Sequence, residues 1–402
     1  MRKQLKSLIF NRNPGNRFSI PVLLSSIEKR GLEKSFSIRV ADDLCPDSVP
    51  DEAIVAFSFQ TVHLPEVRAD VRRFRKKAGI RLIAGGPHAT GDPENTLKLG
   101  FDAVFQGDGE IILPDFLETL AGSGKWPEKQ IFRADPLDDL EQSLPFSGMD
   151  PFIPPIEIMR GCGQACRFCQ TRGRKPVYRP MDSVRLYLKE IRRRNMLLRL
   201  GFICPDGFGY KQEGLETAEA VEMLLAESRS MGIRFLEYGI FPSEVRPNHV
   251  TPQLLAVVRE YCSNRKITVG AQSGSERVLR QVCRGHGRES IEKAAGLIRE
   301  AGFKPQLDFI IGFPGETEDD RLETLEFMRR MGTRYGAWNQ VHYFLPLSGT
   351  PYYGMKPSAI SASTVRKLDR LASAGLANDW WKKGLVLSRK IVETLEEMER
   401  NE

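Results

Sequence analysis

Three closely spaced cysteines are the part of this sequence with the clearest chemistry. Cys162, Cys166 and Cys169 follow the strand-like run Ile156–Met159, and glycines flank the first of them. Thiolates are soft ligands suited to iron–sulfur clusters, and three of them leave one iron of a four-iron cluster open to a small molecule. A zinc site would need a fourth ligand, and no histidine lies at the usual spacing. The spacing therefore predicts a [4Fe–4S] cluster with one open iron.

The pattern Cys-x3-Cys-x2-Cys after a first barrel strand resembles the radical S-adenosylmethionine (SAM) superfamily. The aromatic Phe168 before the third cysteine is typical of that superfamily. The resemblance implies that the open iron binds SAM and that reductive cleavage of SAM gives a 5′-deoxyadenosyl radical. It also implies that Phe168 lies in the cofactor site and that a reductant such as ferredoxin or flavodoxin supplies the electron.

Polar residues at the ends of later strands extend this cofactor site. The segment Val269–Glu276 and the following Arg284-Gly285-His286 resemble the branch that contains methylthiotransferases and cobalamin-dependent enzymes. Hydroxyl and amide side chains at a strand end suit hydrogen bonds to a ribose or a carboxylate, although a serine there can equally cap a helix. The candidate SAM contacts from this segment are Gln272, Ser273 and Ser275.

Two further segments add candidate SAM contacts. Ile310–Thr317 resembles the glycine-rich, acid-terminated segment that flanks the adenine, which implies roles for Gly312 and for Glu316, expected to begin the next helix. Glu244 and Arg246 lie two residues apart and would point the same way on an extended segment. Contact with SAM and a structural salt bridge are equally favoured for this pair.

Cys204 ends the second predicted barrel strand, where its thiol could face the cavity. It is a candidate catalytic residue, as a thiyl participant or accessory ligand, and Asp206 and Tyr210 are polar candidates nearby. The alternative for Cys204 is a small buried core residue.

The N-terminal region resembles the cobalamin-binding domain that precedes many radical SAM barrels. Gly107-Asp108-Gly109-Glu110 stands where that family has Gly-Glu-Gly-Glu, and the Asp-x-His-x-x-Gly motif for a lower axial histidine is absent. The resemblance therefore implies cobalamin without such a histidine ligand, or a domain that has kept the fold and lost the cofactor. The implied cobalamin contacts are Ser58, Gln60, Thr61, Gly85, Gly86, His88, Gly107, Gly109 and Glu110.

Short apolar runs alternate with amphipathic segments through most of the chain, which predicts parallel sheets covered by helices, an α/β fold. We expect a Rossmann-like cobalamin-binding domain over residues 1–125 and a Pro-, Gly- and Asp-rich linker over 126–155. Six longer strand–helix units predict a partial (β/α)6 barrel over 156–350, with its site at the carboxyl ends of the strands. A helical C-terminal extension should follow over 351–402.

Composition narrows the setting of this chemistry. The chain has 402 residues, a net charge of +7 and seven cysteines. An odd cysteine count with one tight cluster argues against a disulfide framework, and no apolar run is long enough to span a membrane or act as a signal core. A cytoplasmic location is expected, and nucleic acid is disfavoured as a partner because no known nucleic-acid-binding motif accompanies the basic runs.

The two domains together predict a cobalamin-dependent radical SAM methyltransferase. It would methylate an unactivated carbon of a small-molecule or peptide substrate by means of a 5′-deoxyadenosyl radical and methylcobalamin. A rearrangement or ring contraction without methyl transfer is the alternative within this chemistry. A methylthiotransferase is less favoured because Cys45 is the only cysteine before the barrel. A non-catalytic iron–sulfur or corrin-binding module is the alternative from another class.

Overall fold

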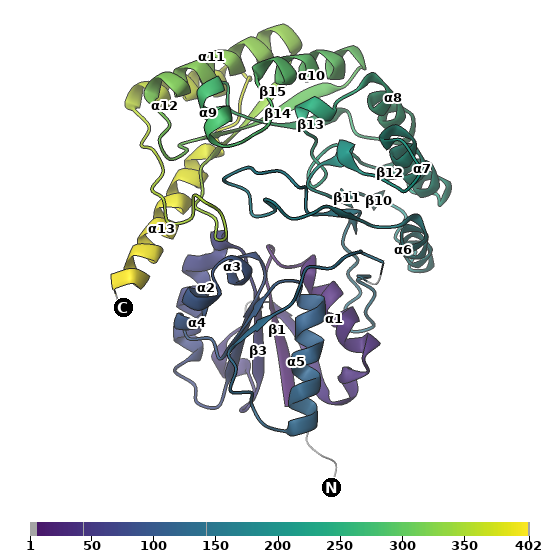
Figure 1. Cartoon of the computed structure of the whole chain (residues 1–402), viewed down its shortest axis with the longest axis vertical. Helices are drawn as coiled ribbons and strands as arrows, with labels where there is room; N and C mark the ends of the chain where they lie inside the picture. The colour runs from purple at the N-terminus through teal and green to yellow at the C-terminus, as the bar shows by residue number, and fades with distance from the viewer. Residues whose placement is uncertain (1–5, 43, 142, 401–402) are drawn as a thin grey trace.

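The N-terminal domain is a six-stranded parallel sheet with helices on both faces (Figure 1). The computed structural model describes residues 6–42, 44–141 and 143–400, so the outermost residues of the predicted first and last units lie outside it. The strand order is β2-β1-β3-β4-β5-β6, so β2 lies on one side of β1 and all later strands lie on the other. The strands are β1 (Lys6–Arg12), β2 (Phe36–Asp42), β3 (Ile54–Ser58), β4 (Arg81–Gly85), β5 (Ala103–Gln106) and β6 (Ile131–Arg133).

Both faces of this sheet are buried, as the continuous apolar runs of its strands require. Leu8 and Phe10 of β1 pack against the helices on one face, while Ile9 between them packs against the other. The helices of this domain are α1 (Ser19–Lys29), α2 (Leu64–Phe74), α3 (Pro87–Gly91), α4 (Pro93–Lys98) and α5 (Gly109–Ser123).

Strand β6 lies inside the segment that the sequence analysis predicts as a linker. It pairs in parallel with β5, with Val104 opposite Ile131, and the Phe132 ring packs edge-on against Phe105. An apolar run of two residues is too short to be told from a loop by periodicity. The linker prediction is therefore corrected: the sheet continues to residue 133, and the crossing to the barrel begins after it.

The second part of the chain is a partial barrel of six parallel strand positions, as predicted. The first three positions are formed by β7 (Ile156–Glu157) and β8 (Met159–Arg160), by β10 (Arg199–Leu200) and β11 (Phe202–Ile203), and by β12 (Phe235–Leu236). The last three are β13 (Lys266–Gln272), β14 (Lys304–Ile311) and β15 (Trp338–Tyr343). Neighbours pair in sequence order, with a single bridge from Val245 to Val269 joining the third and fourth positions.

Helices cover the outside of the barrel, and a short strand, β9 (Val177–Tyr178), pairs antiparallel with β8 beyond the cysteine loop. The barrel arches over one end of the N-terminal sheet (Figure 1). The barrel helices are α6 (Met181–Arg193), α7 (Thr217–Ser230), α8 (Pro252–Tyr261), α9 (Glu276–Gln281), α10 (Arg288–Glu300) and α11 (Glu318–Tyr335).

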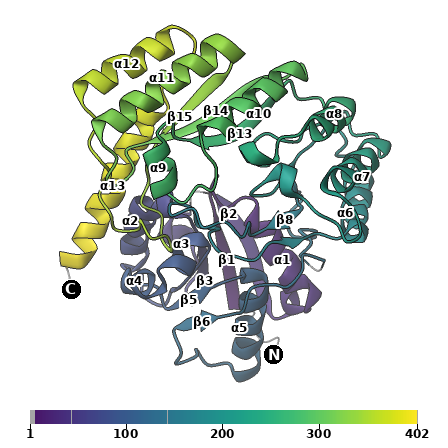
Figure 2. The same cartoon turned by 45° about the horizontal axis from the view of Figure 1, so that its top comes forward.

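The C-terminal extension is a helix pair, α12 (Ala362–Ser373) and α13 (Trp381–Arg400). Helix α13 contacts β15 at its start and lies beside α2 further along (Figures 1 and 2). Leu395 and Met398 pack against the core of the N-terminal domain, and Arg68 of α2 forms an ion pair with Glu397. The extension thus ties the two main parts together. Among the described helices, none is both long and apolar enough to cross a bilayer.

Candidate functional site

A cavity of about 460 Å³ lies inside the barrel, next to the cysteine loop. All three cysteines of the motif line it, and so do side chains from the first five strand positions. The predicted residues that line it are Phe168, Cys204, Glu244, Arg246 and Gln272, besides the cysteines themselves. The barrel therefore gathers at one place residues that are more than one hundred positions apart in the sequence.

Two of the three sulfurs in the cysteine loop lie near the hydroxyl of Thr171. Thr171 Oγ1 lies 3.0 Å from Cys169 Sγ and 3.9 Å from Cys162 Sγ. Gly161 has a positive φ of 78°, and a Cβ there would come within 2.6 Å of the carbonyl oxygen of Lys175, so the tight start of the loop requires glycine. Burial raises the pKa of the Cys169 thiol.

The donor set of this loop fits a four-iron cluster rather than a single ion. Among the described residues, no three His, Cys, Asp or Glu side chains converge closely enough to hold one metal ion. A cubane cluster holds its cysteines at separate corners, and three thiolates around a cavity of this size match that arrangement. Cys162, Cys166 and Cys169 are therefore the residues that would hold the cluster.

One wall of the cavity carries acids and arginines from several strands. Glu244 and Arg246 follow the third strand position, and Arg284 follows α9. Burial raises the pKa of Glu244, and it raises the pKa of Asp308 on β14 to about 7. Gln340 donates a hydrogen bond of 2.6 Å to Asp308 Oδ1. The cavity thus combines buried cations with two carboxyl groups whose pKa is raised by burial, that of Asp308 to about 7.

Gln272 is the predicted contact with the most distinctive backbone. Its φ of +71° is uncommon for a residue other than glycine, and a register shift in the β13–β14 pairing falls between Gly270 and Gln272. Such irregularities re-aim a side chain next to a functional site. The amide of Gln272 lines the cavity as a result.

The prediction that Ser273 and Ser275 contact SAM is corrected by their hydrogen bonds. Ser273 Oγ lies 3.0 Å from Thr324 Oγ1, and Ser275 donates to Asp320 at 2.7 Å. Both serines are buried away from the cavity and tie the end of β13 to α11. Strand-end polarity alone could not distinguish this structural role from a ligand contact.

Gly312 and Glu316 also lie outside the cavity lining. The Gly312 N–H donates to Glu316 Oε2 at 2.6 Å, and a Cβ on Gly312 would meet the Tyr343 ring at 2.7 Å. Burial raises the pKa of Glu316 to about 7. Glu316 does not begin the helix as predicted, because Thr317 caps α11, whose first residue is Glu318. The hydrogen bond between Gly312 and Glu316 therefore closes the turn that follows β14.

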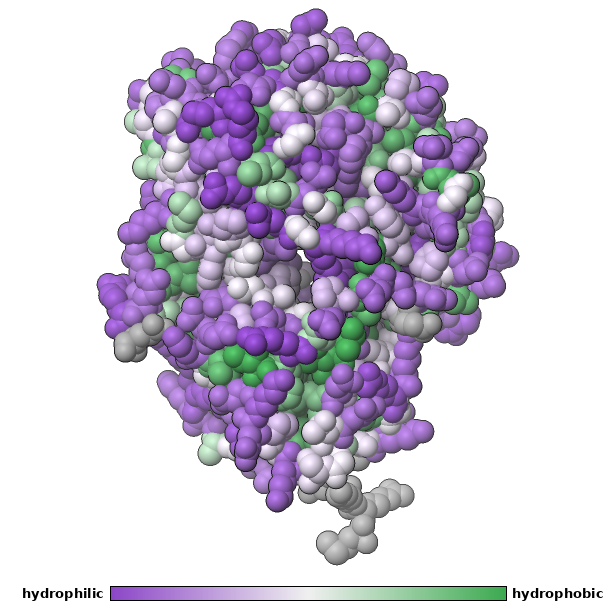
Figure 3. All heavy atoms as spheres, viewed as in Figure 1, coloured by the Kyte–Doolittle hydropathy of each residue, from purple (hydrophilic) through white to green (hydrophobic). Residues whose placement is uncertain are grey.

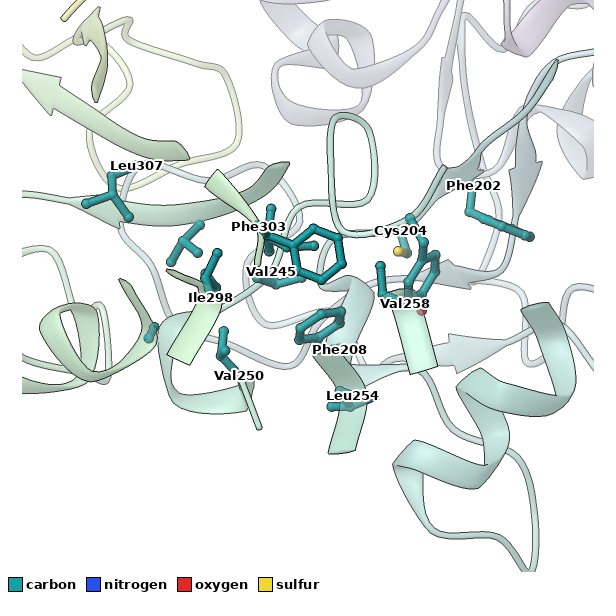
Figure 4. Close-up of a cluster of buried hydrophobic side chains, with 14 of the residues drawn as sticks. Phe202, Cys204, Phe208, Val245, Val250, Leu254, Val258, Ile298, Phe303 and Leu307 are labelled. Atoms are coloured by element: carbon teal, nitrogen blue, oxygen red, sulfur yellow. The ribbon is translucent and has the colours of Figure 1, made fainter. Parts of the chain in front are cut away.

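Of the three catalytic candidates, only Cys204 lines the cavity. Figure 4 shows it among apolar side chains of the barrel core, and burial raises the pKa of its thiol. Asp206 instead accepts hydrogen bonds from the backbone N–H of Arg246 and from His249, and the Tyr210 hydroxyl donates to the Arg179 carbonyl at 3.0 Å. These contacts assign Asp206 and Tyr210 to the barrel framework and correct the catalytic prediction for both.

The carboxyl edge of the N-terminal sheet faces the barrel, where the resemblance implies cobalamin. Gly86 has a φ of +91°, and a Cβ there would come within 2.8 Å of the Phe59 backbone nitrogen, so the turn after β4 requires glycine. Ser58 and Gly85 end two adjacent strands at this edge, and Gln60 is exposed beside them. On the face seen in Figure 3, a hollow lies between the two parts of the molecule.

Thr61 and His88 at this edge contact Ser348, which follows the last barrel strand, β15. Thr61 Oγ1 lies 3.0 Å from His88 Nδ1 and accepts a hydrogen bond of 3.0 Å from the Ser348 N–H. Burial lowers the pKa of His88 to about 4 and keeps the ring neutral. Both side chains are fully buried, and Thr61 connects the two domains, which favours a structural role for the pair over the predicted corrin contacts.

The acids of the Gly107–Glu110 motif bind arginines at the two ends of the cysteine loop. Asp108 accepts two hydrogen bonds from Arg174, at 3.0 and 2.6 Å, and lies 3.2 Å from Arg160. Glu110 accepts from Arg160 at 2.8 Å. This ion pair favours a structural role for the Glu110 carboxylate over the predicted corrin contact. Gly107 and Gly109 provide the turn that presents these acids.

Sequence reasoning missed Arg284 and Asp308 as cavity residues, and Arg160 and Arg174 as loop anchors. The signal for Asp308 was present, since it is a lone acid inside the otherwise buried run Gln306–Ile311. The two loop anchors carry no such signal because their partners lie in the other domain.

Comparisons with known proteins agree with this arrangement. Residues 156–328 match the model of the Radical SAM superfamily, and residues 48–117 match the B12 binding domain. A tRNA-2-methylthio-N(6)-dimethylallyladenosine synthase from Sorangium cellulosum is 30% identical over 298 residues, covering 66% of this chain and 59% of that protein. The chain spans about half the length of several curated relatives that it matches.

Two solved structures share the fold. The radical SAM methyltransferase TsrM from Kitasatospora setae, with cobalamin and a [4Fe–4S] cluster, has a TM-score of 0.65 and 16% identity, over 87% of this chain and 77% of that chain. The cobalamin-dependent radical enzyme OxsB has a TM-score of 0.61 and 17% identity, over 94% and 56%. The chain therefore carries a Radical SAM domain that follows a B12 binding domain, in the predicted order.

Proposed function

We propose that this protein is a cobalamin-dependent radical SAM methyltransferase acting on an unactivated carbon. The observation that carries the proposal is the direct contact between the two cofactor regions. The Gln170 side chain, next to Cys169, donates to the Pro87 carbonyl at 3.4 Å and to the Ser348 carbonyl at 3.2 Å. Pro87 follows the glycine pair at the end of β4, so a corrin at this edge and a cluster on the loop would face one space.

When bound, the cluster supplies the electron that cleaves SAM, and cobalamin supplies a methyl group. The residues of this chain do the rest. Cys162, Cys166 and Cys169 would hold the cluster and leave one of its irons open to SAM. Phe168, Glu244, Arg246 and Gln272 line the cavity beside that position and would orient SAM. The barrel wall would shield one side of a radical site from water.

The corrin contacts that remain in this proposal are Ser58, Gln60, Gly85, Gly86, Gly107 and Gly109. They stand at the ends of adjacent parallel strands, which is where an open α/β sheet binds its ligand. Backbone without side chains at the glycines allows a large flat ring or its tail to approach closely. A substrate of small-molecule or peptide class would enter from the hollow between the domains.

The test uses the full chain reconstituted anaerobically with iron, sulfide and hydroxocobalamin. With SAM and a strong reductant, we expect 5′-deoxyadenosine from the radical step and S-adenosylhomocysteine whose formation requires corrin. Cys166→Ala should abolish the first product, and Gly86→Val should abolish corrin retention on gel filtration. A chain that retains no corrin and forms no S-adenosylhomocysteine refutes the methyltransferase proposal.

Methylthiotransferase chemistry is the second candidate, because curated relatives of that activity match the chain. Cys45, the one cysteine before the barrel, is exposed and stands alone. Corrin-independent transfer of sulfur to tRNA by the reconstituted protein would favour this candidate over methyl transfer.

A further inference from the structure

Two buried arginines lie together against the cysteine loop. Arg246 is 5% exposed and Arg284 is 9% exposed, and the Nε of each has no hydrogen-bond partner in the described structure. Burial and the charge of Arg284 lower the pKa of Arg246. Placing two positive charges side by side away from water is unfavourable unless an anion compensates them. The pair therefore marks a position where negative charge is expected.

The contacts of Arg284 identify that anion. Its Nη1 donates to Cys166 Sγ at 3.5 Å, and its Nη2 donates to the Gly270 carbonyl at 2.8 Å. The planar guanidinium fixes both directions at once. Gly270 makes room for it, because a Cβ there would lie 2.6 Å from Nη2.

Arg246 supports the same arrangement from the neighbouring strand. Its Nη2 donates to the backbone carbonyl of Arg284 at 2.8 Å. This hydrogen bond fixes the backbone from which the Arg284 side chain extends. Both guanidinium groups line the cavity that the three cysteines line.

We infer that Arg284 is a positioning residue for the cluster, which holds the Cys166 thiolate by a charge-assisted hydrogen bond and raises the cluster's reduction potential. The inference rests on the proposed function, since it requires a cluster on the loop. Hydrogen bonds to ligand sulfur and nearby positive charge favour the reduced, more negative state of an iron–sulfur cluster. Arg284 thereby makes it easier for an external reductant to reduce the cluster.

The experiment is a redox titration of the reconstituted full chain without SAM, followed by the electron paramagnetic resonance signal of the reduced cluster. Arg284→Met should shift the reduction equilibrium about tenfold toward the oxidised state, which is about 59 mV for a one-electron couple. Arg284→Lys keeps the charge and should recover part of the shift. Arg280→Met removes an exposed arginine four residues earlier and should leave the midpoint unchanged.

Iron content is measured for every variant, and Arg284→Gln replaces Arg284→Met if the latter does not hold iron. An unchanged midpoint in whichever variant holds iron overturns the inference, as does an equal shift in Arg280→Met. A loss of SAM affinity with an unchanged midpoint overturns it too, and would assign Arg284 to SAM. If the wild-type chain forms no four-iron cluster or no 5′-deoxyadenosine, the proposed function fails instead, so the two failures are distinct.

Discussion

Replacing Asp108 by asparagine should release the cysteine loop from the N-terminal domain. Asp108 is the junction of this contact, since it accepts two hydrogen bonds from Arg174 and one from the backbone N–H of Leu137, and lies beside Arg160. These arginines hold its pKa below the usual range despite its burial. The substitution keeps the size of the side chain and removes the charge that binds both arginines.

The expected magnitude follows from the surroundings of the two arginines. Removing one partner of a buried ion pair costs about 3–5 kcal/mol. Arg160 keeps Glu110 and Glu157, and the side chain of Arg174 is 27% exposed, so the low end applies. We therefore expect the free energy of local opening of the cysteine loop to fall by about 3 kcal/mol. The open population would then be roughly a hundredfold larger.

Hydrogen exchange of residues 159–175 in the cluster-free protein measures this opening directly. Asp102→Asn is the matched control, because Asp102 also binds two arginines and a backbone N–H, but within the N-terminal domain alone. Exchange in the loop should accelerate in Asp108→Asn and not in Asp102→Asn. Wild-type protection of the loop in Asp108→Asn, or equal loss in both variants, would refute the reasoning.

Two further predictions concern the domain junction and the cavity. Gly91→Ala should separate the domains, because the new Cβ would come within 2.5 Å of the Gly349 backbone nitrogen; small-angle scattering should show an expanded molecule, whereas Gly122→Ala, with nothing within 4 Å, should leave it compact. Asp308→Asn should raise the thermal midpoint of the cluster-free protein more at pH 8 than at pH 5. The folded pKa of Asp308 is about 7, against about 3.9 unfolded, so its burial costs stability progressively as pH rises through that window. An equal change at both pH values would contradict this account.

The sequence was sufficient for the fold because the strands of both parts follow simple apolar runs. The family matches and the pairing of the strands confirm the predicted α/β fold with its two cofactor-type domains. Strand β6 was missed because its apolar run, Ile131-Phe132, is too short for periodicity to register. Pairing with β5 stabilises it, and such pairing depends on contacts that local sequence does not carry.

Site residues were predictable where a residue type or spacing is unusual. They were not predictable where the role of a side chain depends on its hydrogen-bond partners in the folded chain. The cysteines have a spacing that few other roles share, and all three reach the cavity. Ser275 and Asp206 look like ligand contacts by position, yet each has a partner elsewhere in the barrel, namely Asp320 and His249. Which polar groups are already satisfied is a property of the folded chain, and only the unsatisfied ones remain for a ligand.

The N-terminal domain contacts the barrel at the ends of three of its strands. After β3, Thr61 accepts a hydrogen bond from the Ser348 N–H, and after β4 the Pro87 carbonyl accepts one from Gln170. After β5, Asp108 accepts one from Arg174. Together these contacts restrain the barrel relative to this edge of the sheet, so the protein itself fixes how a corrin edge would face the cysteine loop. A motion that separates the two regions must break all three contacts and also detach α13 from α2. Since the Thr61 contact is buried and the Asp108 contact is partly buried, such a motion is costly. We therefore expect a substrate to enter through the hollow between the domains (Figure 3).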